Sequence, residues 1–329
     1  MLKLRHLFAN FDLAREALQN WTHDEESLDG ILAQFRISSN AIYPYYQDGA
    51  VCFLRLAPMD EKLRGNIEGE LSFICYLRES DFPAAEPIAS HSGEYLLTLK
   101  TAWGNYFATA FRGVGGIRLD RTDYADDMMH AYGKTLGRLH ALSSRYSPEK
   151  RMWTWEEALL WAEKVLLEYN APDTARRELD SLHVALSALP KSNATYGLVH
   201  YDFEPDNVFF ESGKDLCNVI DFDDGMVHFF ALDIEQAFGE LRDTLSEVDA
   251  KRAEEIFLQG YREEFDLTRE ALETFPLMRR FVDLFRYARI IRSVAETFDN
   301  EPEWMTGLRE ILGSITEDYD KGLRRFFFE

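Results

Sequence analysis

The sequence predicts an α+β fold, with an antiparallel sheet in the first third of the chain and helices in most of the remainder. Three observations support this: β-branched and aromatic runs separated by turn residues before residue 60, a glycine cluster at 113–116, and amphipathic helical spacing from Tyr124 onward. With 329 residues and 46% hydrophobic content, the chain can bury a sizeable core. We therefore expect one globular chain with two lobes, residues 1–112 and 113–329.

The first lobe is predicted to contain a small antiparallel sheet and a helix. Asp48-Gly49 lies between two strand-like runs and is a strong hairpin signal. Leu63, Ile67 and Leu71 repeat at helical spacing. In chain order, the expected elements are a leading helix at 1–20, strands at 31–38, 40–47 and 50–57, a helix at 61–78, and strands at 94–99 and 105–112.

The second lobe is predicted to be mostly helical, with one strand-rich stretch at 197–222. Thr154 and Glu157 have the spacing of a capping box, and Pro190 should end a helix. In chain order, helices are expected at 128–142, 154–169, 174–189, 228–241, 247–265 and 268–297, with a terminal pair after residue 304.

Charge and apolar patterning narrow the range of partners. The formal net charge of −22 disfavours nucleic acids and anionic membrane surfaces, because affinity for them comes largely from Lys and Arg. The same charge would attract a cationic small molecule. No run approaches the ~20 apolar residues of a membrane span. A small-molecule partner is therefore expected, while the oligomeric state is not predicted.

Cysteine content and the N-terminal residues bear on localisation. The three cysteines are odd in number and far apart, which predicts neither a disulfide framework nor a metal site. The first 20 residues mix charge into their apolar positions and have no small-residue cleavage site, unlike a signal peptide. A reducing cytoplasm fits these features.

The stretch GLVHYDFEPDNVFFESGKDLCNVIDF, residues 197–222, has residue types suited to phosphoryl transfer. That reaction needs an acid to orient the attacking hydroxyl and accept its proton, and oxygen ligands for Mg²⁺. Asp202 is the candidate for the first role, and Asn207 and Asp221 for the second. Their separation (221 − 207 = 14) accommodates a short hairpin. His200 is expected to hold the loop backbone in shape.

These residues resemble the catalytic and metal-binding loops of the aminoglycoside phosphotransferase and choline kinase group. HYDFEPDN matches the group's H-x-D-x-x-x-x-N pattern, and VIDFDD matches its I-D-F/W-D/E pattern. FALDIEQA resembles a downstream segment whose acid, here Asp233, supports the loop. The resemblance implies a bilobal protein-kinase-like fold, with ATP or another nucleoside triphosphate and Mg²⁺ as cofactors.

The resemblance extends more weakly into the first lobe. It places Arg55 where the group carries a phosphate-contacting Lys or Arg, and Glu70 as its ion-pair partner. AFRGVGG, residues 110–116, resembles the hinge that holds adenine, which implies cofactor contacts at Phe111 and Gly113. Arg55 replaces the commoner lysine, and the turn 38–40 replaces a Gly-rich loop. Taken alone, Arg55 and Glu70 would be interpreted as a surface ion pair.

The acceptor is expected to be an amino- or ammonium-bearing alcohol, because acidic residues crowd the two loops. These are Glu204, Asp206, Asp223 and Asp224. Solvated loop positions are the alternative interpretation of these four. Two functional alternatives also stay open: a catalytically weak, nucleotide-binding regulatory protein, and a protein Ser/Thr kinase of the same fold.

Overall fold

The computed structural model describes residues 1–328, which form two compact units. The larger unit comprises Ala9–Trp153 and Lys191–Phe275. The helical unit comprises Met1–Phe8, Thr154–Pro190 and Pro276–Glu329. The lobe boundary expected after residue 112 falls inside the larger unit and stays a prediction.

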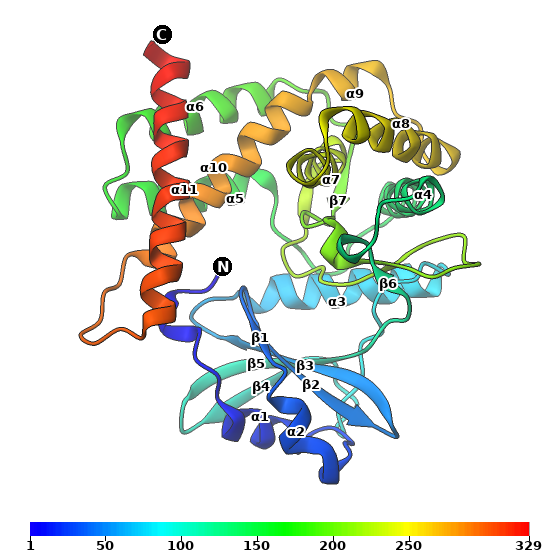
Figure 1. Ribbon diagram of the computed structural model, residues 1–329, viewed down its shortest axis with the longest axis vertical. Coiled ribbons are helices and arrows are strands. Elements are labelled where there is room, and N and C mark those ends of the chain that lie inside the picture. The colour runs from blue at the N-terminus through cyan, green and yellow to red at the C-terminus, as the bar shows by residue number, and fades with distance from the viewer. Residues whose placement is uncertain (329) are drawn as a thin grey trace. The chain divides into compact units, whose positions relative to one another are not determined.

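A five-stranded antiparallel sheet, in the order β1-β2-β3-β5-β4, opens the larger unit (Figure 1). Asp48 and Gly49 both have positive φ between β2 and β3, as the predicted hairpin turn requires. The strands are β1 (Arg36–Ile37), β2 (Ala41–Gln47), β3 (Ala50–Pro58), β4 (Leu97–Thr101) and β5 (Gly104–Arg112).

The two faces of this sheet are covered by different helices. Helices α1 (Phe11–Leu18) and α2 (Leu28–Leu32) lie on the face to which Leu54 and Leu56 contribute. Helix α3 (Arg64–Glu79) covers the other face and packs against β5. Because successive strand residues point to opposite faces, the residue between Leu54 and Leu56 is directed toward α3.

Two predictions at the start of the chain are wrong. The leading helix expected at 1–20 is split into a short 3-10 helix, η1 (Leu4–His6), and α1. Asn10 interrupts it, because its side-chain oxygen accepts a hydrogen bond from the Leu13 backbone N–H at 2.9 Å and starts a new helix. The strand expected at 31–38 is also shorter, since α2 takes its first residues.

The rest of the larger unit combines short strands with helices. Strands β7 and β10 form a two-stranded sheet. Strands β6, β8 and β9 form a three-stranded sheet with β8 in the middle. The helix expected at 228–241 begins later, because β10 takes its first residues to pair with β7. These elements are η2 (Glu25–Ser27), β6 (Ile117–Arg118), η3 (Leu119–Arg121), α4 (Asp126–Ser143), β7 (Tyr196–Val199), η4 (Pro205–Asn207), β8 (Val208–Phe210), β9 (Asn218–Val219), β10 (Met226–Phe229), α7 (Ala231–Thr244), α8 (Glu247–Glu264) and α9 (Arg269–Glu273).

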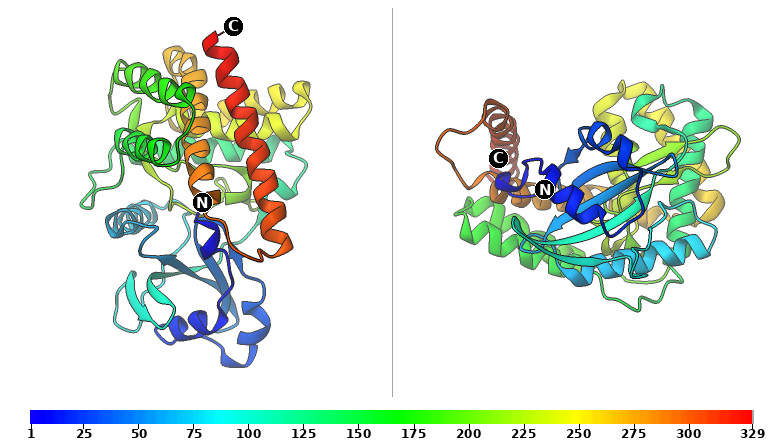
Figure 2. Two further views of the ribbon diagram at one scale, coloured as in Figure 1. Left: turned by 90° about the vertical axis from the view of Figure 1, so that its left-hand side faces the viewer. Right: turned by 90° about the horizontal axis from the view of Figure 1, so that it is seen from below.

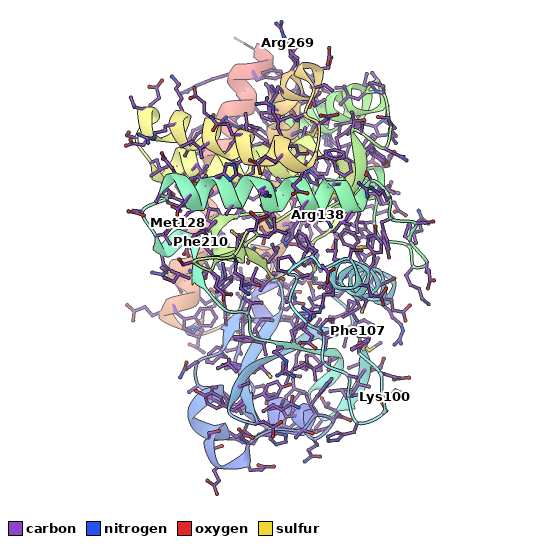
Figure 3. The ribbon with its side chains drawn as sticks, turned by 90° about the vertical axis from the view of Figure 1, so that its right-hand side faces the viewer. Lys100, Phe107, Met128, Arg138, Phe210 and Arg269 are labelled. Atoms are coloured by element: carbon purple, nitrogen blue, oxygen red, sulfur yellow. The ribbon has the colours of Figure 1, made fainter. Side chains whose placement is uncertain are left out.

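Glycines allow α4 and α8 to cross closely. A methyl carbon added at Gly133 would overlap the Phe257 carbonyl, and one at Gly260 would overlap the His130 carbonyl. Figure 3 shows α4 with Met128 and Arg138 labelled along it. Close helix packing therefore accounts for a glycine at position 133.

The helical unit contains α5 (Trp155–Glu168), α6 (Asp173–Ser187), α10 (Phe275–Val294) and α11 (Glu303–Phe328). Figure 2 shows these helices, coloured from green to red, with α5 beside α6. The capping box of Thr154 and Glu157 is present. Arg280 of α10 contacts Glu178 of α6 at 2.7 Å.

The C-terminal helices differ from two predictions. The run expected at 268–297 is divided into α9 and α10, because Thr274 caps α9 and Pro276 opens α10. The terminal pair expected after residue 304 is the single helix α11. Between residues 1 and 328, no helix has both the length and the apolar character needed to cross a membrane. An antiparallel sheet followed by a mostly helical remainder confirms the predicted fold class.

Candidate functional site

The loop between β7 and β8 contains the Asp202 and Asn207 side chains in direct contact. The Asn207 amide nitrogen donates to the Asp202 carboxylate at 2.9 Å and to the Asp202 carbonyl at 3.0 Å. Asn207 itself is buried at the end of η4. This orientation leaves the amide oxygen of Asn207 as the atom that can bind a cation.

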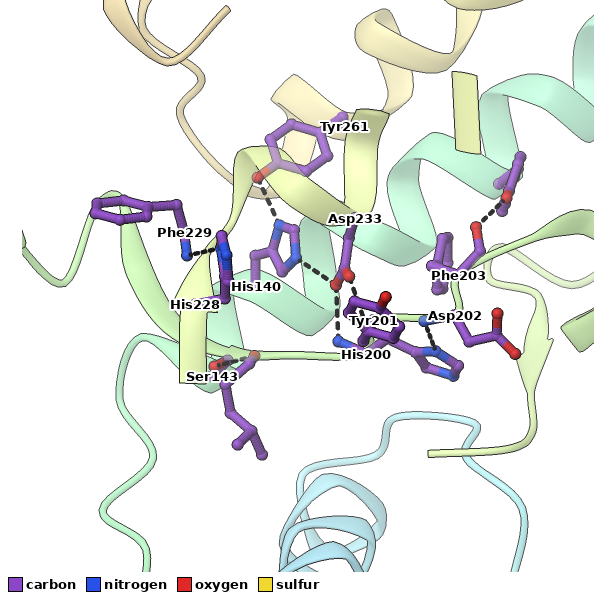
Figure 4. Close-up of polar contacts among 12 residues, drawn as sticks. His140, Ser143, His200, Tyr201, Asp202, Phe203, His228, Phe229, Asp233 and Tyr261 are labelled. Atoms are coloured by element: carbon purple, nitrogen blue, oxygen red, sulfur yellow. Dashed lines mark hydrogen bonds and ion pairs between the residues drawn. The ribbon is translucent and has the colours of Figure 1, made fainter. Parts of the chain in front are cut away.

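Asp233, in the first turn of α7, holds the start of this loop. Its two carboxylate oxygens accept hydrogen bonds from the backbone N–H groups of His200 and Tyr201, both at 2.8 Å (Figure 4). Tyr201 has a φ of 68°, which a non-glycine residue adopts only when its surroundings enforce it. The carboxylate of Asp233 therefore stabilises an unfavourable backbone conformation directly before Asp202.

His140 of α4 supports Asp233 in turn. Its Nε2 lies 3.1 Å from an Asp233 oxygen, and its Nδ1 lies 2.8 Å from the Tyr261 hydroxyl (Figure 4). Burial lowers the pKa of His140, although the contact with Asp233 opposes this shift. A neutral imidazole that donates to Asp233 and accepts from Tyr261 satisfies both contacts.

His200 connects the loop to the strand that precedes Asp221. Its Nδ1 accepts a hydrogen bond from the Asp202 N–H at 3.2 Å, and its Nε2 donates to the Ile220 carbonyl at 2.9 Å. Burial lowers the pKa of His200 despite nearby acids. These contacts fit a residue that shapes the loop, and both ring nitrogens are occupied by backbone groups.

The expected hairpin brings Asn207 beside the segment before Asp221. Val208 of β8 pairs with Val219 of β9, and the Ile220 N–H donates to the Asn207 carbonyl at 3.0 Å. Asp221 has a φ of 65°, a second position of positive φ in the site. Burial, followed by the charges of Asp223 and Asp202, raises the pKa of Asp221 well above its ordinary value.

Arg55 and Glu70 form a buried, two-pronged ion pair. The two terminal nitrogens of Arg55 donate to the two Glu70 oxygens at 2.7 Å each, and its Nε donates to Thr109 at 3.1 Å. The side chains are only 6% and 1% exposed. The surface-pair interpretation is therefore wrong. The guanidinium also lies 5.0 Å from the ring centre of Phe111.

A cavity of about 310 Å³ lies between the sheet and the two loops. It is within the range of small-molecule sites, ~300–1,000 Å³. Its apolar lining includes Ile42, Phe53, Phe111, Val114, Phe209 and Ile220. Its polar lining includes Ser38, Arg55, Glu70, Asp206, Asn207 and Asp221. A cavity lined by both apolar side chains and charged or amide groups is suited to a ligand with an apolar portion and a charged portion.

The segment predicted as a hinge forms part of this lining. Phe111 and Gly113 both line the cavity. The Arg112 N–H donates to the Glu86 carbonyl at 2.8 Å, and the Gly113 N–H to the Val51 carbonyl at 2.9 Å. A methyl carbon at Gly113 would lie 2.8 Å from the Val51 oxygen, so the close approach requires glycine.

The four acidic residues expected near the acceptor have different surroundings. Asp206 lines the cavity and lies 3.4 Å from Arg36. Asp223 and Asp224 face Lys62, at 2.5 Å and 3.7 Å. The Glu204 carbonyl accepts a hydrogen bond from the Asn207 N–H at 3.0 Å.

Lys62 was not predicted as part of the site, and for Asn40 the sequence predicted a place in the turn 38–40 but not its side-chain contact. Asn40 donates to Asp223 at 2.6 Å, and Lys62 contacts the same carboxylate. Although burial opposes the shift, Lys62 and Arg55 hold the pKa of Asp223 well below its ordinary value. Neither residue is part of a recognisable motif, because each lies in a connection between elements.

The oxygen donors of this site fit a hard divalent cation. Mg²⁺ and Ca²⁺ prefer carboxylate and amide oxygens, which Asp221 and Asn207 supply. Asp221 is half-buried, and desolvation, followed by the charges of Asp223 and Asp202, raises its pKa; a bound cation would oppose this shift by stabilising the ionised carboxylate.

Comparisons with known proteins place the chain in a family. The sequence profile of a protein family, described as the phosphotransferase enzyme family, matches residues 39–272 of this chain. Amicoumacin kinase of Bacillus subtilis (strain 168) is 24% identical over 323 residues, covering 91% of this chain and 93% of that protein.

Solved structures show the same fold. An amicoumacin kinase in complex with AMP-PNP, Ca²⁺ and Ami has a TM-score of 0.76 at 21% identity, covering 96% of this chain and 95% of that one. The microcompartment-associated aminopropanol kinase has a TM-score of 0.66 at 22% identity, covering 95% and 98%. A spectinomycin phosphotransferase in complex with ADP and spectinomycin has a TM-score of 0.56 at 14% identity, covering 89% and 93%.

Proposed function

The chain belongs to the phosphotransferase enzyme family and is a kinase, and we propose that it transfers the γ-phosphoryl group of ATP, with Mg²⁺, to a hydroxyl of a small amino- or ammonium-bearing alcohol. The observation that carries this proposal is the contact between the loop that contains Asp202 and Asn207 and the segment that precedes Asp221. The Asp202–Asn207 contact and the Ile220–Asn207 backbone bond bring an acid, an amide and the segment before Asp221 together beside one cavity.

Asp202 is proposed as the catalytic acid–base residue. Its carboxylate would orient the acceptor hydroxyl and take its proton as the hydroxyl oxygen bonds to the γ-phosphorus. The bond from that phosphorus to the bridging oxygen breaks, and the electron pair leaves with ADP. The amide of Asn207, 2.9 Å from Asp202, keeps the carboxylate in one orientation.

Asn207 and Asp221 are proposed to hold the metal ion through one amide and one carboxylate oxygen. An ion held by these two residues would supply positive charge beside the phosphates of the nucleotide and so stabilise the charge that develops during transfer. The related structure with AMP-PNP and Ca²⁺ supports the use of a nucleotide and a divalent cation.

Arg55 is proposed to contact the nucleotide phosphates, and the apolar lining of the cavity to hold the base beside Phe111 and Gly113. A guanidinium fixed by Glu70 and Thr109 presents its charge at a defined place, unlike a mobile lysine. This difference is expected to alter phosphate geometry rather than abolish binding.

The acceptor class is supported by charge and by one relative. The net charge of −22 favours a cationic acceptor, and the aminopropanol kinase is named for an amino alcohol. Asp223 and Asp224 already face Lys62. We therefore propose Glu204 and Asp206 as the first acids to test for contact with the acceptor's amine.

The test is turnover on matched acceptors. Purified protein with ATP and Mg²⁺ would be given amino alcohols and neutral diols of equal size, with ADP release and ³¹P NMR of the product as readouts. We expect phosphorylation of the amino alcohols. Asp202→Asn should lower the rate about 10²–10⁴-fold. Asp215→Asn is the matched control, because Asp215 is 78% exposed and its ion-pair partner is Lys134.

Three results would count against parts of this proposal. A preference for neutral diols would overturn the acceptor class. Phosphate incorporated into protein alone would indicate a protein kinase. Nucleotide binding without turnover, unchanged in Asp202→Asn, would overturn the assignment as an active enzyme.

A further inference from the structure

The loop that follows β9 is hydrogen-bonded to two residues from connections next to strands of the five-stranded sheet. Asn40 comes from the turn 38–40 between β1 and β2, and Lys62 from the connection between β3 and α3. The Asn40 amide nitrogen and the Lys62 ammonium both donate to the same Asp223 oxygen, at 2.6 Å and 2.5 Å.

Asp223 is enclosed at this junction. Its side chain is 6% exposed, and Asn40 is 4% exposed. A buried carboxylate needs charge or hydrogen-bond compensation, and here an ammonium and an amide supply it together. An Asp223 oxygen held by both groups is poorly suited to receive an acceptor's amine as well.

The two ends of this junction touch different parts of the proposed active site. At one end, the turn 38–40 is closed by a hydrogen bond from the Ser38 N–H to the Asn40 carbonyl at 3.0 Å, and Ser38 lines the cavity. At the other end, Asp223 lies two residues after Asp221, whose φ of 65° must be maintained by its surroundings.

We propose that Asn40, Asp223 and Lys62 form a tether that couples nucleotide contact at the turn 38–40 to the position of the metal ligand Asp221. Asp223 is then a positioning residue and not a contact of the acceptor. The inference rests on the proposed function, since it requires a nucleotide at the turn and a cation at Asp221. Each ligand should consequently strengthen binding of the other.

The test measures coupling, not activity. AMP-PNP binding would be measured by calorimetry with Mg²⁺ and with EDTA, and the ratio of the two Kd values gives the coupling. Asn40→Ala and Lys62→Met should each reduce this ratio about 5-fold or more, and Lys62→Met, which lies outside the turn 38–40, should change Kd in EDTA less than about 2-fold. Lys100→Met is the matched control, because Lys100 is exposed on β4 of the same sheet (Figure 3).

A rescue variant separates coupling from general damage to the fold. The conservative substitution Lys62→Arg keeps a charged donor for the Asp223 oxygen and should retain much of the ratio that Lys62→Met loses. An unchanged ratio in Asn40→Ala and Lys62→Met would overturn the tether. Equal weakening of both Kd values is one form of that result, since it leaves the ratio unchanged and marks a purely structural role. Wild-type protein that binds no AMP-PNP would overturn the proposed function itself.

Discussion

Glu70 and Asp233 are both carboxylates with no more than 1% exposure, yet they are stabilised in different ways. Glu70 meets a guanidinium in a two-pronged ion pair. Asp233 meets two backbone N–H groups and the imidazole of His140. The first arrangement fixes a positively charged side chain at the cavity. The second fixes the backbone conformation that precedes Asp202.

This difference separates two ways of preorganising a site. A buried ion pair depends on both partners, because loss of either one leaves an uncompensated charge. A carboxylate bonded to backbone groups depends on the number of donors that it accepts, and each contact can be weakened separately. Substitutions at Glu70 and at Asp233 should therefore differ in how far they lower the free energy of unfolding and in which part of the structure they disturb.

The largest expected effect is that of Glu70→Ala. Arg55 would be left buried without its partner, which should lower the free energy of unfolding by about 3–5 kcal/mol. Urea denaturation measures the change. Glu68→Ala is the matched control on the same helix, because Glu68 pairs with the half-exposed Arg64 and should cost about 0–1 kcal/mol. Equal losses in the two variants would contradict the comparison.

Asp233→Asn should have the next largest effect. The amide keeps one acceptor oxygen but directs an N–H group toward a donor of the loop, which should cost about 2–3 kcal/mol. Asp243→Asn, at an exposed position of the same helix, should change the unfolding free energy by less than about 0.5 kcal/mol. Loss of kcat with little change in nucleotide Kd would locate the damage in the loop. An unaltered kcat would argue against this role for Asp233.

The sequence predicted this site unevenly, for physical reasons. Asp202, Asn207 and Asp221 follow from residue types at fixed spacing, and the hairpin that joins their segments follows from local strand and turn preferences. Burial of Arg55 and Glu70 did not follow, because it depends on how α3 packs across the sheet. The contacts of Lys62 and Asn40 to Asp223 were missed because they join residues 161 and 183 positions apart.

The fold shows the same pattern. Long helices with a clear apolar face were predicted close to their observed bounds, as for α8. Predicted element bounds were wrong where a single contact decided which secondary structure forms. The Asn10 cap divides the first helix, and pairing with β7 converts the expected start of α7 into β10. Caps and strand pairing involve single atoms and distant partners, which apolar periodicity does not reveal.

Acidification should lower the free energy of unfolding through the buried histidines near Asp233, His140 and His200. Burial lowers the pKa of His140 and of His200 below the ordinary value of 6.5, so both stay neutral in the folded state to lower pH than in the unfolded chain. Unfolding then takes up protons, and stability is lost as the pH falls below about 6.5. At about pH 5.5, each imidazole should cost up to about 1.4 kcal/mol.

Urea denaturation at about pH 7.5 and about pH 5.5 measures this loss. Other groups also titrate in this window, so the informative quantity is the difference between wild type and His140→Gln. The variant should lose less stability on acidification. His91→Gln, at an exposed position, is the control and should follow the wild type. A pH dependence that is the same in all three proteins would show that His140 does not carry the effect.

Tyr261→Phe should give the smallest effect, and it tests how far support for the loop extends from the active site. The variant removes a hydroxyl 2.8 Å from His140 Nδ1 without changing the packing of the ring. Loss of one hydrogen bond should cost about 1 kcal/mol. Tyr95→Phe, with Tyr95 42% exposed, should cost nothing measurable. If the Tyr261 hydroxyl helps to orient His140 toward Asp233, Tyr261→Phe and Asp233→Asn should be non-additive in a double-mutant cycle. Strict additivity would confine support of the loop to Asp233, its two backbone donors and His140.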